Sequence, residues 1–196
     1  MTSHAMAALL PAVKLDASTP VGDDADVALL AWMLEATRPW PAQAEATLQA
    51  LLDAHRGGQA DPAAWRGLRR AAVTLGDEGD PHLTALGRVA EAAAWPLGNS
   101  ASALVELLRA ICQLRAFQAS RASGWTTRDQ EEAETILNGI ADGDGTRVPE
   151  RHEIPGLFQV SHPALAKRFV AQLEASNQAY RQFSADVAAW IKGTLS

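Results

Sequence analysis

An acidic, glycine-containing string in the C-terminal third of the chain is the first place to look for chemistry. It begins at Asp142 with the letters Asp-Gly-Asp-Gly-Thr, and Asp142, Asp144, Thr146 and Glu153 follow the ligand spacing of a calcium loop. Carboxylate oxygens are the ligands that calcium takes. However, Arg147 stands where the sharp turn of such a loop needs glycine. The sequence therefore predicts a solvated turn and no bound metal, with Asp142, Asp144 and Glu153 as the residues that a cation would have to use.

The same string resembles the nucleophile motif of haloacid-dehalogenase-like phosphatases. In that family a buried apolar strand delivers the first aspartate to the edge of a sheet. Here the pattern before Asp142 is that of an amphipathic helix. Too little chain follows for the rest of a Rossmann-like domain, so the chain is not predicted to be such a phosphatase.

Other catalytic and cofactor motifs are missing from the sequence. The five histidines lie in separate segments, and there is no HExxH, CxxC, Walker or GxSxG pattern. The single cysteine, Cys112, falls in an apolar helical run and is predicted to be a small buried side chain. No cofactor is predicted, and the sequence leans against an enzyme. An active site assembled from distant residues stays open, because its geometry is not visible in one sequence.

Three arginines are candidates for binding an anion. Arg66, Arg69 and Arg70 share one face of a predicted helix, opposite Trp65 and Ala72. Against this stands a net charge of −6 with a pI near 5.3, which disfavours nucleic acid and anionic lipid and favours a basic partner. We therefore expect a solvated or salt-bridged helix face and no nucleic-acid binding.

Three of the six tryptophans stand at predicted helix junctions. Trp40 and Trp95 each precede a proline, and Trp125 follows a glycine. Tryptophans at such places commonly cover the ends of a helical bundle. When partly exposed they anchor protein interfaces. We therefore take Trp40, Trp95 and Trp125 as the candidate interaction residues.

The composition and the helix signals predict an all-α fold. Alanine, the best helix former, occupies 40 positions, although a GC-rich bacterial genome also enriches alanine and arginine. Helix starts at Asp61-Pro62 and Asp80-Pro81 combine a capping side chain with proline at the first helical position. The prediction is a single-domain bundle of about seven helices. It comprises an N-terminal arm over 1–22, a helical bundle over 23–141, a loop over 142–160 and a long C-terminal helix over 161–192.

The predicted C-terminal helix carries a heptad-like seam, in which apolar residues alternate at spacings of four and three. The seam residues are Phe169, Leu173, Ser176, Tyr180, Phe183, Val187 and Trp190. Such a seam faces a partner helix. The partner helix belongs either to the same chain or to a second copy, so a homodimer through this helix stays open.

The function predicted from these features is a non-catalytic protein-interaction module of the inhibitor, immunity, adaptor or accessory-subunit type. The alternative is an enzyme or a helical domain that binds a small ligand, using the acidic loop over 142–153 or a pocket between helices. With one cysteine and no run of apolar residues long enough to cross a bilayer, a soluble cytoplasmic protein is expected.

Overall fold

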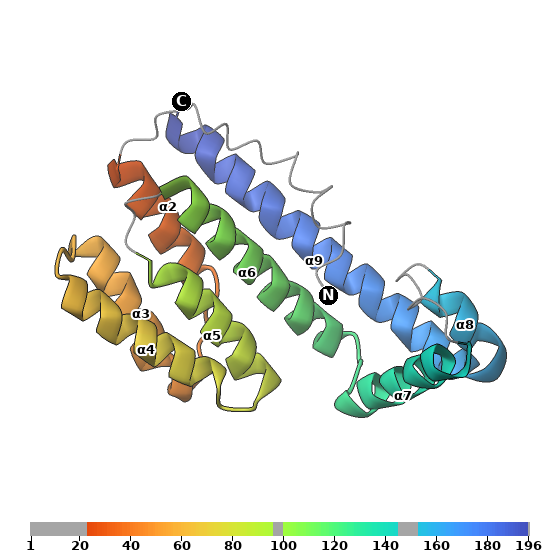
Figure 1. Ribbon diagram of the computed structural model, residues 1–196. Coiled ribbons are helices and arrows are strands. Elements are labelled where there is room, and N and C mark those ends of the chain that lie inside the picture. Colours follow the sequence, from red (N-terminus) through yellow and green to blue (C-terminus); the bar gives the residue numbers. More distant parts are fainter. Residues whose placement is uncertain (1–22, 96–99, 145–152, 196) are drawn as a thin grey trace. The chain divides into compact units, whose positions relative to one another are not determined.

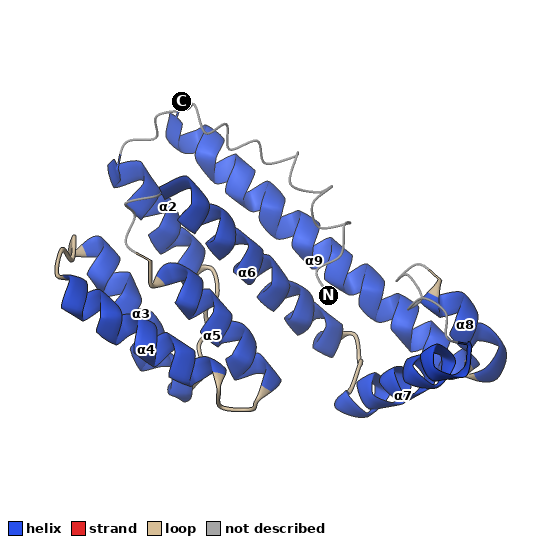
Figure 2. Cartoon of the chain, in the orientation of Figure 1, coloured by secondary structure: helices blue, strands red, loops and turns tan. Residues whose placement is uncertain are grey.

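The computed structural model describes residues 23–95, 100–144 and 153–195. These residues form eight helices and no strand (Figure 1, Figure 2). The helices are α2 (Asp23–Glu35), α3 (Ala42–Arg56), α4 (Pro62–Gly76), α5 (Pro81–Ala93), α6 (Ser100–Ala122), α7 (Thr127–Asp144), α8 (Ile154–Ser161) and α9 (Pro163–Leu195). The prediction of an all-α fold with a long C-terminal helix is confirmed. The arm predicted over 1–22 lies outside the described residues.

Helix α8 corrects the prediction of a loop over 142–160. Proline and glycine disfavour the interior of a helix, but Pro155 is in the first turn of α8, where its missing N–H is not needed. Phe158 is fully buried, and its burial offsets the cost of about 1 kcal/mol for a glycine inside a helix. The predicted start of the loop at residue 142 is also too early, because α7 continues through Asp144.

The chain separates into two compact units. Unit 1 comprises residues up to Arg115 and from Tyr180 onward, and unit 2 comprises Ala116–Ala179. Both boundaries fall inside helices, one within α6 and one within α9. The prediction that the chain is a single domain stays a prediction.

The core of unit 1 is built from α2 to α5 with the first part of α6 and the last part of α9. Leucines dominate its fully buried side chains, and Trp32 on α2 stacks against Phe183 on α9 with ring centroids 6.1 Å apart. Helices α3, α4 and α5 contact one another and lie side by side in Figure 1.

The α4–α5 hairpin has a very close helix crossing. Asp61 caps α4 by accepting a hydrogen bond from Ala63 N, and Asp80 caps α5 by accepting from His82 N, as the sequence predicted. At the crossing, Gly87 faces Gly76 so closely that a Cβ on Gly87 would lie 2.4 Å from Gly76 Cα. This contact fixes the register of the two helices.

The core of unit 2 is smaller and more aromatic. Phe169 on α9 makes edge-on contacts with Trp125 and Phe158, each with ring centroids 5.6 Å apart. The buried part of this cluster is completed by Ala133 of α7 and by Leu165 and Ala166 of α9. The first half of α9 thus holds α7 and α8 together within the unit.

Candidate functional site

Trp40 and Trp125 are core residues that close helix junctions. Trp40 is 8% exposed, and its indole N–H donates to Thr37 Oγ1 at 2.7 Å. Trp125 is 5% exposed and donates to Gln130 Oε1 at 3.1 Å. They belong to different units. Neither offers the large exposed ring that a tryptophan anchor presents to a partner.

Trp95 differs from the other two junction tryptophans because it is 54% exposed. It lies directly after Ala94, the C-terminal cap of α5. The guanidinium of Arg69, on α4, lies over the Trp95 ring with its Cζ 3.7 Å from the ring centroid. This stacking is a cation–π contact that holds the exposed ring against α4.

The hairpin positions Arg69 and Trp95 against each other. Trp65, Ala72 and Leu75 form the buried face of α4. Arg66 and Arg70 are exposed on the opposite face, as predicted, and Arg69 is half-buried at its margin. The structure therefore brings one predicted interaction residue, Trp95, into contact with one of the three predicted anion-binding residues, Arg69.

Val73 adds an apolar side chain to this surface. It is 43% exposed and stands one helical turn after Arg69, at the i+4 spacing that makes neighbours on a helix face. We call the surface formed by the exposed Arg66, Arg70, Val73 and Trp95 and the half-buried Arg69 the α4–Trp95 surface.

The arginines of this surface have no acidic partner in the part of the chain that the structure describes. Among the described residues no carboxylate forms an ion pair with Arg66, Arg69 or Arg70. The ion pairs of exposed or half-exposed arginines lie elsewhere, as at Arg56 with Glu35 and Arg109 with Glu106. Of the two alternatives that the sequence left open, a solvated or a salt-bridged face, the described residues show the solvated one.

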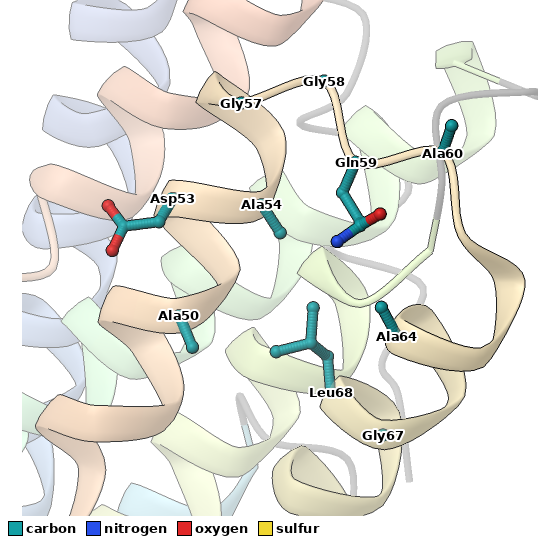
Figure 3. Close-up of a pocket in the computed structure, with 10 residues that line it drawn as sticks. All are labelled: Ala50, Asp53, Ala54, Gly57, Gly58, Gln59, Ala60, Ala64, Gly67 and Leu68. Atoms are coloured by element: carbon teal, nitrogen blue, oxygen red, sulfur yellow. The ribbon is translucent and has the colours of Figure 1, made fainter.

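A groove of about 740 Å³ between α3 and α4 is the structure's candidate for a small-molecule pocket (Figure 3). Seven of its ten lining residues are alanine or glycine. Asp53 points away from the groove and accepts a hydrogen bond from Gln49. Gln59 points into the groove, but its Oε1 accepts from Asp61 N. Since these polar groups already have partners and do not converge, the groove shows no catalytic arrangement.

His55 is buried where α3, α4 and α5 meet. Its Nε2 lies 2.7 Å from the Ala93 carbonyl oxygen, and its ring centroid lies 4.7 Å from that of Trp65. Burial lowers the pKa of His55, while the hydrogen bond to Ala93 opposes this effect. The side chain is a neutral structural bridge between helices.

Cys112 is fully buried in unit 1, as predicted. Burial raises the pKa of its thiol from 9.0 to about 11, and the contact with Ser184 Oγ at 3.8 Å opposes this effect. Because the thiolate is the nucleophilic form, this position does not provide a reactive cysteine.

The candidate metal ligands lie where α7 ends and where α8 begins. Asp142 and Asp144 fall in the last turn of α7, Glu153 precedes α8, and the segment 145–152 between them lies outside the described residues. Elsewhere in the described part of the chain, no group of three or more histidine, cysteine or acidic side chains could hold a metal ion.

The sequence reasoning missed an ionic network in unit 2, in which the carboxylate of Asp129 is buried and Arg168 is partly exposed. Asp129 is 6% exposed, accepts hydrogen bonds from the N–H and hydroxyl of Thr126, and pairs with Arg168 at 2.7 Å. Desolvation raises the pKa of Asp129, but the bonds from Thr126 and Arg168 outweigh it and lower the pKa below its usual value. Thr126 and Asp129 form the capping box of α7.

The heptad-like seam of α9 is covered by the chain itself. Phe183 and Val187 are buried in the core of unit 1, where Tyr180 and Trp190 pack against them. Phe169 is buried in the core of unit 2, where Leu173 packs against it. The seam is therefore used within the chain, and a homodimer through it has no support in the structure.

Comparison of the chain with protein-family models, with curated proteins and with solved structures gives no match. Within the described residues no helix is both long and apolar enough to cross a membrane. A function has to be argued from the geometry of the chain.

Proposed function

We propose that this protein acts by binding another protein through the α4–Trp95 surface. The observation that supports this best is Trp95, which is 54% exposed and yet stacked on Arg69. A tryptophan in this state keeps a large apolar area in water that a partner could cover. Tryptophan and arginine are also the residue types most enriched among the energetically dominant contacts of interfaces.

The stacking of Arg69 on Trp95 favours binding because it restricts the motion of the ring before a partner binds. Binding normally costs about 0.5–1.5 kcal/mol for each flexible side chain that becomes fixed. Trp95 and Arg69 already restrain each other, so less of this cost remains at binding. A surface tryptophan without such a contact would lose more side-chain entropy on binding.

The enzyme alternative lacks a comparable observation. The α3–α4 groove is lined mainly by alanine and glycine, and its polar side chains are bonded to neighbours. With a single cysteine the chain can form no internal disulfide, which fits a reducing compartment. We propose that the binding takes place in the cytoplasm.

Site-specific photo-crosslinking tests the proposal. A photoreactive amino acid is placed at Val73, inside the surface, or at Ala185, which is exposed on α9, and each variant is irradiated in the cells from which the gene comes. We expect one protein to crosslink from Val73 in stoichiometric amounts and not from Ala185. Loss of that adduct when Trp95 is replaced by alanine would add support. No Val73 adduct, or equal adducts from both positions, would contradict the proposal.

A further inference from the structure

The α4–Trp95 surface offers hydrogen-bond donors without matching acceptors. Among the described residues, no group accepts from the guanidinium of Arg66, Arg69 or Arg70, or from the indole N–H of Trp95. The Nε of Arg69 is itself buried without a partner. Arg66 and Arg70 are exposed, so a ligand that brings carboxylate acceptors can reach their guanidinium groups.

The charge of this surface is opposite to that of the chain as a whole. The chain carries a net charge of −6, whereas three arginines that form no ion pair with any described residue gather on one face of α4. The expectation of a basic partner came from the total charge. At the surface itself the local charges decide which groups can approach, and they favour carboxylates.

Resting on the proposed function, we propose that the partner presents an acidic segment to the α4–Trp95 surface, with carboxylates flanking an apolar side chain. The carboxylates pair with Arg66 and Arg70, whose guanidinium groups can each donate two parallel hydrogen bonds to one carboxylate. The apolar side chain covers Trp95 and Val73. Nucleic acid is disfavoured because three arginines neutralise few phosphates in a chain that is otherwise acidic.

An unbiased peptide selection tests the chemistry of the partner. A phage-displayed library of random peptides is selected on the immobilised wild-type protein after depletion on the Trp95→Ala variant. We expect the enriched peptides to be net negative and to contain an aromatic or large aliphatic residue. Neutral or basic enriched peptides, or no enrichment, would overturn the acidic-segment proposal.

A second experiment reverses the charge of the two exposed arginines. The Arg66→Glu/Arg70→Glu variant should bind the enriched acidic peptides about tenfold or more weakly, since each partly exposed ion pair contributes a factor of about 2–5. Arg181→Glu, which reverses an exposed arginine on α9, is the matched control and should leave binding unchanged. Circular dichroism checks that all variants remain folded. Equal effects of the two reversals would overturn the proposal.

The two proposals fail in different ways. A protein that crosslinks from Val73 but binds equally well to the Arg66→Glu/Arg70→Glu variant would retain the proposed function and refute the acidic segment. Single-stranded oligonucleotides are titrated in parallel. If they bind the surface more tightly than the selected peptides, and lose binding on charge reversal, the partner is a nucleic acid and the acidic segment is refuted.

Discussion

Replacing Gly87 by alanine should destabilise unit 1, because the α4–α5 crossing leaves no room for a side chain. The added Cβ would lie 2.4 Å from the Cα and 2.5 Å from the N of Gly76, whereas carbon atoms in contact stay about 3.5–4.0 Å apart. Both obstructing atoms are backbone, so the helices themselves must separate. Overpacking of this severity costs about 3 kcal/mol, and the better helix propensity of alanine returns about 1 kcal/mol. The expected loss is about 2 kcal/mol in the free energy of unfolding.

Gly67 provides the matched control on the same hairpin. It is an exposed glycine inside α4 with nothing within 4 Å of an added Cβ, so Gly67→Ala should stabilise the protein by about 0.5–1 kcal/mol. Urea unfolding followed by circular dichroism measures both variants. A Gly87→Ala variant as stable as the wild type would refute the close crossing and the register of Trp95 against Arg69 that depends on it.

Three further predictions concern buried polar groups. Burial lowers the pKa of His55, so the unfolded chain binds the proton more readily and the free energy of unfolding should fall as the pH drops below about 6.5. In urea titrations at several pH values, His55→Gln should flatten this pH dependence. An unchanged pH dependence would contradict a buried neutral histidine. Cys112, with its pKa raised to about 11 chiefly by desolvation, should resist a thiol reagent until the protein unfolds, and rapid labelling of the native protein would contradict its burial. Asp129→Ala should lower the free energy of unfolding by about 1–2 kcal/mol, because it removes the hydrogen bonds that cap α7 and the ion pair with Arg168. Asp186→Ala, at an exposed site on α9, is the control and should have little effect. Equal losses of stability in the two variants would contradict a stabilising role of the Asp129 network.

Local signals in the sequence predicted much of the fold. Asp61 and Asp80 cap their helices through their own side chains, and Gly124 takes a positive φ of 88° after α6, which suits glycine. These features depend on a few consecutive residues, so a single sequence contains them. The arginine face of α4 was predicted for the same reason, because helical periodicity fixes which residues share a side.

Features that depend on packing between distant segments could not be predicted in this way. Trp40, Trp95 and Trp125 have similar neighbours in sequence, but their exposure is decided by what the rest of the chain places over them. The pairing of Arg69 with Trp95 joins two helices and was visible only once their register was known. Helix α8 was missed because Phe158, whose burial stabilises it, finds its contact with Phe169 on α9.

The affinity of the protein that crosslinks from Val73, purified and titrated by calorimetry into the wild type and the Trp95→Ala variant, tests the central claim most directly. Trp95 is exposed, so its removal should leave the fold intact, which circular dichroism verifies. We predict that Trp95→Ala weakens binding by about 2 kcal/mol, or roughly thirtyfold, as expected for an anchoring tryptophan. Equal affinity of the two proteins would contradict the claim that this chain binds its partner through the α4–Trp95 surface.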